Sequence, residues 1–240
     1  LDKYDRREIK ETTPLFRAFG LISGDVDLFK AFNDARGSGT LAYYSFDERA
    51  ITVRGSKLTR ATYATVVHEL THALQDQHFS LSAREKKLVR DTDANMAYHS
   101  VLEGEALLVM MAHMLAKNGV SLDEVVKDEA MLAMLGNAAQ VDSMIDPSTP
   151  RYFVEMLKFP YLEGLKFVAT AYRRGGWAAV DRIHANPPRS TREIYDPDEY
   201  FARDAAGPAR TFNPATPEGA IAAEHLGVFH WRFLVGAENS

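Results

Sequence analysis

The alternation of apolar and polar residues predicts one β-hairpin followed by a series of helices. Between residues 40 and 54, "TLAYYSF" and "ITVR" are rich in aromatic and β-branched residues and flank the polar "DERA", which is typical of a hairpin. From Thr59 to about His78 the apolar residues recur at helical spacing. The residues that share one apolar face of this helix are Val66, Val67, Leu70, Ala73 and Leu74.

Two further long helices are predicted after the hairpin. One runs from about Glu85 to Lys117 and ends near Gly119. The other, in "RYFVEMLKFPYLEGLKFVATAYRRGG", is interrupted at Pro160 and ended by Gly175 and Gly176, because proline and glycine both disfavour a helix interior.

Shorter helices complete the pattern. Thr13-Pro14 starts one near the amino terminus, and "DVDLFKAFNDARG" predicts another that Gly37 closes. Capping boxes at 121–124 ("SLDE") and 190–193 ("STRE") open two more. We therefore expect a mainly helical α+β fold in a single domain, with segments 1–58, 59–118 and 119–240 carrying the hairpin, the central helices and a helical carboxy-terminal part.

Composition narrows the function classes. The 240 residues carry a formal net charge of −5, so a nucleic-acid partner is not expected. No apolar run approaches the roughly 20 residues that cross a bilayer. Because there is no cysteine, a metal must be held by His, Asp or Glu. The chain begins at Leu1 without methionine, and "GVFHWRFLVGAENS" stops soon after an apolar run, so we expect the protein to extend beyond both ends. We favour a secreted or cell-envelope bacterial location, and the oligomeric state stays open.

The strongest chemical signal is "VVHELTHALQDQHF", in which His68, Glu69 and His72 form H-E-x-x-H. On a helix, positions i and i+4 share a face, so both imidazoles can bind one metal ion. Glu69 can then act as the general base for a water molecule that the metal makes acidic. The pattern predicts one zinc ion and hydrolytic chemistry.

A catalytic zinc needs a third protein ligand. His78 follows His72 by six residues, but Gln75 stands where a glycine turn is required, so the helix continues and His78 points away from the ion. In "HSVLEGEALLVMM" two glutamates interrupt an apolar helix, and a carboxylate there is costly unless it is paired or bound to metal. We expect Glu103 to be the third ligand, with Glu105 as the alternative.

Several other polar residues are candidates for supporting roles. Tyr161 follows Pro160 and is the first candidate for the oxyanion donor, ahead of Tyr195 and His184. Asp76 is a candidate for support behind a ligand. His99, one turn before Glu103, is expected to be structural.

These motifs resemble the gluzincin class of zinc metallopeptidases, in which HExxH is joined by a glutamate from a later helix; "EGEA" at 103–106 matches that context. More closely, "HELTHALQDQHF", "LEGEALLVM", "FPYLEGLKFV" and "PPRSTREIYDPDEY" resemble a bacterial family of predicted metallopeptidases. The chain departs from these patterns at Asp196, where histidine is expected, and at Leu107, where aspartate is common. The resemblance implies a zincin-like fold and a peptide or protein substrate.

The hairpin ahead of the metal helix suggests a substrate strand that pairs with its edge, and the lack of a G-x-M-E-N-like segment favours an endopeptidase. Two other readings remain open. The first is a zinc-binding module without catalysis. The second is a ferritin-like di-iron protein, with Glu69-x-x-His72 and Asp181-x-x-His184 as the paired motifs.

Overall fold

The computed structural model describes residues 10, 13–22, 24, 26–30, 41–81, 91–137, 149–203 and 226–236. A two-stranded sheet of β1 (Ala42–Ser45) and β2 (Ala50–Val53) precedes the three long helices α3 (Arg60–Phe79), α5 (Thr92–Ala116) and α9 (Arg151–Ala185). The shorter helices are α6 (Leu122–Val125), α7 (Glu129–Asn137), α10 (Thr191–Tyr195), α11 (Pro197–Ala202) and α12 (Val228–Leu234). The expectation of a mainly helical α+β protein is confirmed.

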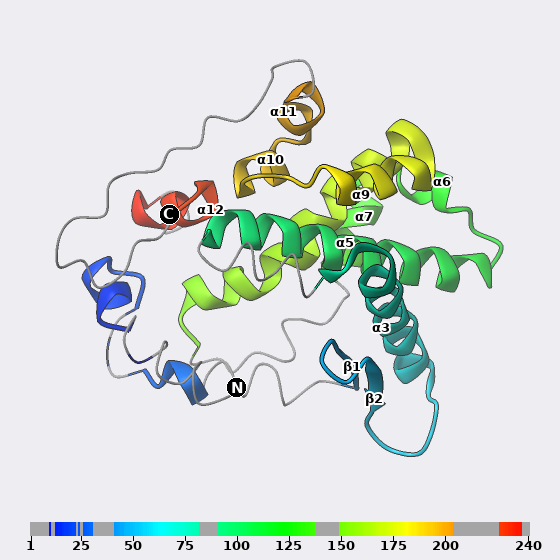
Figure 1. The fold of residues 1–240 in the computed structure, drawn as a ribbon, viewed down its shortest axis with the longest axis horizontal. Helices are drawn as coiled ribbons and strands as arrows, with labels where there is room; N and C mark the ends of the chain where they lie inside the picture. The colour runs from blue at the N-terminus through cyan, green and yellow to red at the C-terminus, as the bar shows by residue number, and fades with distance from the viewer. Residues whose placement is uncertain are drawn as a thin grey trace.

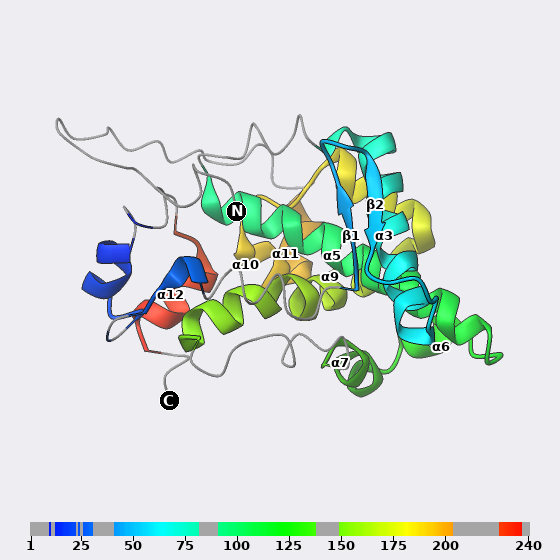
Figure 2. The same ribbon diagram turned by 90° about the horizontal axis from the view of Figure 1, so that it is seen from below.

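The long helices set the layout of the molecule. α5 packs against α9 along its length, and α3 packs against α5 (Figure 1). The hairpin and α3 lie at one end of the molecule and α12 at the opposite end, as the two perpendicular views agree (Figures 1 and 2). Among the described helices, none combines the length and the hydropathy needed to cross a membrane.

The predicted hairpin is present, and its register determines which backbone groups face α3. The strands are antiparallel with Tyr43 opposite Thr52 and Tyr44 opposite Ile51. Arg54 N–H donates to the Leu41 carbonyl at 2.8 Å, which makes that pair hydrogen-bonded. Because such pairs alternate along an antiparallel ladder, the N–H of Tyr44 points away from β2.

Helix α3 begins and ends close to the predicted residues. The Thr59 side chain caps its first turn by accepting from Thr62 N–H at 3.1 Å. At the other end Ser80 adopts the left-handed conformation (φ 54°), and its N–H bonds the Asp76 carbonyl at 3.0 Å. The helix runs without a break through Gln75, as its lack of a glycine turn predicted.

The buried face of α3 is its polar face. The helix buries Thr62, His68, Thr71, His72, Gln75 and Asp76, whereas Leu70 is 49% and Leu74 53% exposed. Of the predicted apolar face, Leu70 and Leu74 are exposed, and Val66, Val67 and Ala73 are only partly buried. The most deeply buried face of α3 is thus the polar one, unlike that of a usual amphipathic helix. The reason is chemical: the inward side chains bond to one another and to α5, so their burial is compensated.

Helices α5 and α9 approach so closely that only glycine fits where they cross. A Cβ atom on Gly104 would lie 2.3 Å from the Gly164 carbonyl carbon and oxygen, and one on Gly164 would lie 2.0 Å from the Ser100 carbonyl oxygen. The glycines of "LEGEALL" and "YLEGLKF" thus give these two segments a shared structural role. Glu103 and Glu105 are the chain neighbours of Gly104 at this crossing.

The boundaries of α5 and α9 differ in part from prediction. α5 starts at Thr92, where the Asp91 side chain accepts from Ala94 N–H at 3.0 Å, and not near Glu85; residues 82–90 lie outside the described part. α9 continues through Pro160, so the predicted interruption there is wrong. The predicted end is present as a kink, because Gly175 and Gly176 leave helical geometry before a last segment to Ala185.

The two predicted capping boxes have different outcomes. At Ser121 both reciprocal bonds of the box are present. Ser190 precedes α10, but its side chain makes no cap bond, and the prediction of a box there is wrong. The Glu193 carboxylate instead accepts hydrogen bonds from Arg189 N–H at 2.8 Å and from the buried guanidinium of Arg203 at 2.9 Å.

A buried carboxylate holds α5 to the elements that follow α9. Asp93 accepts from the hydroxyl of Thr191 at 2.6 Å and from its N–H at 3.2 Å, and that hydroxyl accepts from Phe229 N–H at 3.0 Å. A Cβ atom on Gly227 would lie 1.8 Å from the Asp93 carboxylate. The "PPRSTREI" segment therefore serves to join α5, α10 and α12.

Near the amino terminus, residues 13–18 are helical as predicted, and residues 28–30 are helical within "DVDLFKAFNDARG". The predicted end of that second helix at Gly37 lies outside the described residues. The buried apolar side chains of the described segments form one continuous core that extends from Ile22 to Phe233 in sequence.

Candidate metal centre

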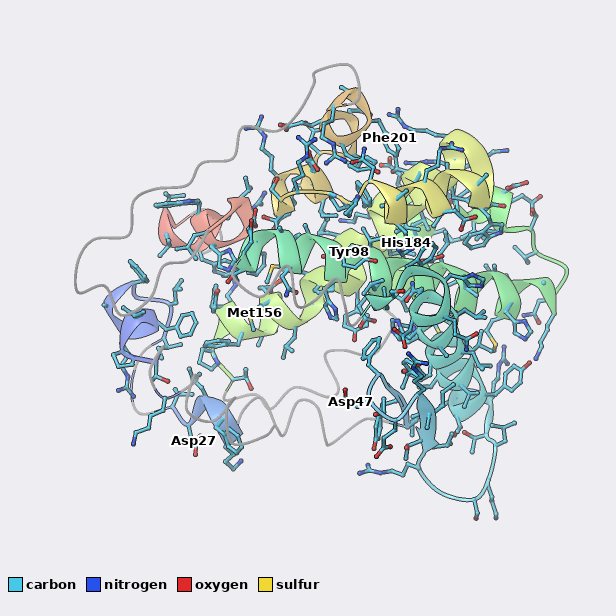
Figure 3. All side chains as sticks on the ribbon, in the orientation of Figure 1. Asp27, Asp47, Tyr98, Met156, His184 and Phe201 are labelled. Carbon is cyan, nitrogen blue, oxygen red and sulfur yellow. The ribbon has the colours of Figure 1, made fainter. Side chains whose placement is uncertain are left out.

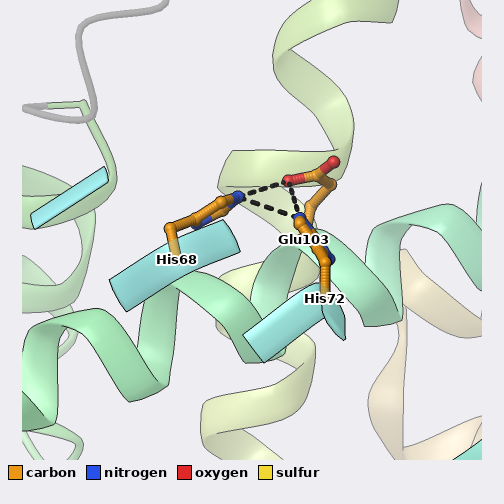
Figure 4. Close-up of side chains that lie close together, drawn as sticks. All are labelled: His68, His72 and Glu103. Atoms are coloured by element: carbon orange, nitrogen blue, oxygen red, sulfur yellow. Dashed lines mark hydrogen bonds and ion pairs between the residues drawn. The ribbon is translucent and has the colours of Figure 1, made fainter. Parts of the chain in front are cut away.

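Three side chains from two helices converge at the junction of α3 and α5 (Figure 4). Glu103 Oε2 lies 3.1 Å from His68 Nε2 and 3.5 Å from His72 Nε2, and the two Nε2 atoms are 3.1 Å apart. All three residues are buried. Within the described residues this is the only group of His, Asp and Glu that is arranged to hold a metal ion.

The spacing of these three atoms fits a tetrahedral metal ion. Zinc binds nitrogen and oxygen ligands at about 2.0–2.1 Å, so neighbouring ligand atoms of a tetrahedron lie about 3.3 Å apart. The observed separations of 3.1, 3.1 and 3.5 Å agree with that edge length. Two imidazoles and one carboxylate also form a donor set that zinc uses in hydrolases, with a fourth position left for substrate or water.

Electrostatics favour a cation between these groups. Burial alone would raise the pKa of Glu103, but the charge of His72 and hydrogen bonds from both histidines outweigh it and hold that pKa well below its usual range. Burial alone would lower the pKa of His72, yet the Glu103 charge and hydrogen bonds raise it to about 9. The carboxylate of Glu103 thus favours positive charge on the histidines beside it.

Glu69, the predicted general base, lies beside the three ligands and is held by the hairpin. Its Oε2 accepts from the backbone N–H of Tyr44 at 2.8 Å, the group that points away from β2. The Tyr44 hydroxyl donates to Asp76, about two helical turns beyond Glu69 along α3, at 3.0 Å. Tyr44 therefore fastens β1 to α3 at two points, one of which orients the Glu69 carboxylate.

The pKa of Glu69 is raised. Burial is the largest cause, and the nearby charge of Glu103 adds to it, against the opposing effects of the two histidines and the Tyr44 N–H. A raised pKa makes a carboxylate a stronger base, which suits a residue that must take a proton from water.

The hairpin edge does not offer a free donor at Tyr44. β1 lies next to Glu69 as expected, but Ala42 and Tyr44 are buried and the Tyr44 N–H is already bonded to the glutamate. The expectation that a substrate strand pairs with this edge therefore fails at Tyr44. The strand instead positions the carboxylate.

Of the three candidate oxyanion donors, Tyr161 is the one near the ligands. Its partly buried ring is stacked against His68, with centroids 6.4 Å apart and planes 26° apart. His184 is completely buried behind Glu105. Tyr195 packs against Phe159 and under the Arg232 guanidinium, in the cluster next to α12.

The structure separates Glu103 from Glu105. Glu103 lies against the Nε2 atoms of His68 and His72. Glu105 Oε2 is instead 2.7 Å from Gln75 Nε2 and 2.7 Å from His184 Nε2. The alternative of Glu105 as ligand is therefore wrong. The rotation of about 200° between two residues that are two apart on a helix predicted that one of them would face elsewhere.

The remaining candidate residues take varied positions. His78 lies exposed in the last turn of α3 against Phe79, outside the group of three, as predicted. His99 Nε2 is 3.5 Å from Glu103 Oε1 and its side chain is 49% exposed, so it borders the site rather than the core. Asp76 accepts a hydrogen bond from the Tyr44 hydroxyl and is not the residue that bonds a histidine ligand.

Sequence reasoning missed Gln75 and Tyr44. Gln75 Oε1 bonds His72 Nδ1 at 2.9 Å, the role that had been considered for Asp76. Its signal was present, because position i+3 from a ligand on the same helix face is within reach of that ligand. Tyr44 had no such signal, since its contact depends on how the hairpin folds onto α3.

The di-iron reading does not match this geometry. It requires the second motif, Asp181-x-x-His184, to meet the first, but Asp181 is exposed and His184 bonds Glu105 and Tyr98. His68 would also lack the role that its position beside Glu103 gives it.

Compared with protein-family models, with curated protein sequences and with solved structures, the chain shows no significant match to any of them. The functional conclusion therefore rests on the chemistry of the site.

Proposed function

We propose that the protein is a zinc-dependent peptidase in which His68, His72 and Glu103 hold the metal and Glu69 is the general base. The observation that carries this proposal is the triangle of ligand atoms, whose sides of 3.1, 3.1 and 3.5 Å fit tetrahedral zinc, with a further carboxylate beside it. The likeness of HExxH and "EGEA" to gluzincins supports the same assignment, and with it a zincin-like site.

Each residue has a defined task in this proposal. A bound zinc ion supplies Lewis acidity, which makes water acidic near neutral pH and polarises a carbonyl group. Glu69 takes the proton from the attacking water and later passes it to the leaving amine. Oε2 of Glu69 already accepts a hydrogen bond from the Tyr44 N–H, so we assign the acceptance of this proton to Oε1.

Tyr161 is assigned to the developing oxyanion. Its ring lies roughly parallel to that of His68, one of the three ligands, and we assign its hydroxyl to donate a hydrogen bond to the substrate oxygen. Loss of one such donor costs about 10²–10³ in turnover. Tyr161→Phe should therefore lower kcat by that factor and leave KM and zinc content unchanged.

The test combines metal analysis with cleavage of an internally quenched peptide library whose ends are blocked, which reports endopeptidase activity. The full chain should bind one equivalent of zinc and cleave peptides in the library. Glu69→Gln should keep the zinc and lose about 10²–10⁴ of the activity. The matched control is Glu129→Gln, at a side chain that is 87% exposed on α7, and it should behave as the parent does.

Two results would overturn the proposal. If Glu69→Gln cleaves peptides as fast as the parent, Glu69 is not the base. If zinc is bound but no peptide is cleaved, the protein is a zinc-binding module without this catalytic function.

A further inference from the structure

A continuous set of buried hydrogen bonds runs from His72 away from the metal centre into the core. His72 Nδ1 lies 2.9 Å from Gln75 Oε1, and Gln75 Nε2 donates to Glu105 Oε2 at 2.7 Å. The same Glu105 Oε2 atom is also 2.7 Å from His184 Nε2. His184 and its neighbour Tyr98 lie at the centre of the molecule (Figure 3).

The surroundings of Gln75 allow only one orientation of its amide. The Nε2 side faces two acceptors, the Leu102 carbonyl at 3.1 Å and Glu105 at 2.7 Å, so this side must carry the NH₂ group. The opposite side, Oε1, can only accept a hydrogen bond. His72 must therefore donate from Nδ1, which leaves the lone pair on Nε2 free to bind a metal.

The far end of this chain of side chains is buried and closely packed. His184 has no exposed surface, and its ring stacks on Phe79 with centroids 3.9 Å apart and planes 7° apart. The Tyr98 hydroxyl lies 3.2 Å from its other ring nitrogen. If Glu105 rotated, its hydrogen bonds with Gln75 and His184 would both be lost in a buried position, where an unpaired carboxylate is costly.

We propose that Gln75, oriented by Glu105 and His184, is a positioning residue that holds His72 in the tautomer and ring orientation that bind zinc. The inference rests on the proposed assignment of His72 as a metal ligand. Such support behind a ligand typically contributes about 10- to 100-fold to metal affinity. It also accounts for the use of a glutamine that is 2% exposed where a packed apolar residue would avoid the burial of polar groups.

The first test compares Gln75→Met with Gln77→Met. Methionine keeps the length of glutamine but forms none of the three hydrogen bonds of Gln75. Gln77 is an exposed glutamine two residues further along the same helix. Zinc affinity of the full chain is measured by competition with a chromogenic chelator. We expect Gln75→Met to bind zinc about 10- to 100-fold more weakly and Gln77→Met to match the parent. Equal affinity in both variants would overturn the proposal.

The second test separates positioning from general stability. If Glu105 acts through Gln75, Glu105→Gln should weaken zinc binding in the parent but have little further effect in Gln75→Met. Independent structural damage would instead make the two losses multiply. Multiplying losses would show that Glu105 does not act through Gln75.

A third measurement needs no variant. In nitrogen-15 NMR spectra of the zinc-loaded full chain, the Nδ1–H of His72 should appear as a proton that exchanges slowly with solvent. A His72 ring with no protected Nδ1–H would contradict the proposed bond to Gln75.

His72→Ala separates the test of the metal assignment from the test of Gln75. If His72→Ala binds zinc as the parent does, the assignment of the metal centre is wrong. If His72→Ala loses zinc while Gln75→Met keeps full affinity, only the role of Gln75 is refuted.

Discussion

Replacement of Gly104 by alanine tests the close crossing of α5 and α9. In an ordinary helix interior, alanine is more favourable than glycine by about 1 kcal/mol, so the substitution would normally stabilise the protein. Here the new Cβ atom would lie 2.3 Å from the Gly164 carbonyl carbon and oxygen and 2.8 Å from Leu165 N. All three are backbone atoms, which cannot move aside by a change of rotamer.

The size of the effect follows from these distances. Ordinary contact begins at 3.4 Å, so the two helices must separate by about 1 Å at their crossing point. Overpacking of this kind costs about 1–3 kcal/mol, and a clash between two backbones belongs at the upper end. After the gain from alanine's helix propensity, we expect a net loss of about 2 kcal/mol, or roughly 4–8 °C in Tm for a chain of this size.

The assay is urea unfolding followed by circular dichroism, with Gly136→Ala as the control. In α7 a Cβ atom on Gly136 would meet only the flexible ends of Leu162 and Leu165, at 3.3 and 3.4 Å. That substitution should be neutral or stabilising. If Gly104→Ala is as stable as the parent, the backbone contact at the crossing is wrong. Because Glu103 adjoins Gly104, the variant should also bind zinc more weakly.

Three other perturbations have defined outcomes. Burial lowers the pKa of His230 to about 4, so between pH 6.5 and 4 the unfolded chain takes up a proton that the folded chain does not. Stability therefore falls as the pH falls from 7 to 4, and His230→Phe should remove about 3 kcal/mol of that fall in pH-dependent urea unfolding. Tyr44→Phe leaves the buried carboxylate of Asp76 without its hydroxyl donor and should cost about 1–3 kcal/mol in the same assay. Thr191→Val removes the hydroxyl that links Asp93 to α12 and should cost about 2–3 kcal/mol.

Tyr44→Phe has a matched control at an exposed position on the same strand. Tyr43→Phe alters a half-exposed tyrosine on the same strand as Tyr44 and should change stability by less than about 0.5 kcal/mol. Equal effects of Tyr43→Phe and Tyr44→Phe would contradict the buried bond to Asp76. A pH profile that His230→Phe leaves unchanged would contradict the burial of a neutral imidazole.

Local signals predicted the elements around the site. Alternation of aromatic and β-branched residues located the hairpin, and Thr59 marked the start of α3. Rotation along a helix placed His68 and His72 on one face and Glu103 and Glu105 on different faces. These properties depend on spacing along one element, which a sequence states directly.

Properties that depend on contacts between elements were not predictable in the same way. The apolar face of α3 gave no sign that the polar face would be buried, because that burial depends on partners from α5. Pro160 gave a wrong prediction, because α9 continues through it where the sequence alone indicates a break. The pairing of Gly104 with Gly164 needs two helices to meet, and each glycine alone looks like a weak point in a helix.

The central claim is that His68, His72 and Glu103 hold a single zinc ion. Its most direct test is a crystal of the zinc-loaded full chain, with anomalous diffraction collected on both sides of the zinc absorption edge. The account predicts one anomalous peak at about 2.0–2.1 Å from the two Nε2 atoms and from the Glu103 carboxylate. A peak bound to other residues, or no peak between α3 and α5 in zinc-saturated crystals, would contradict it.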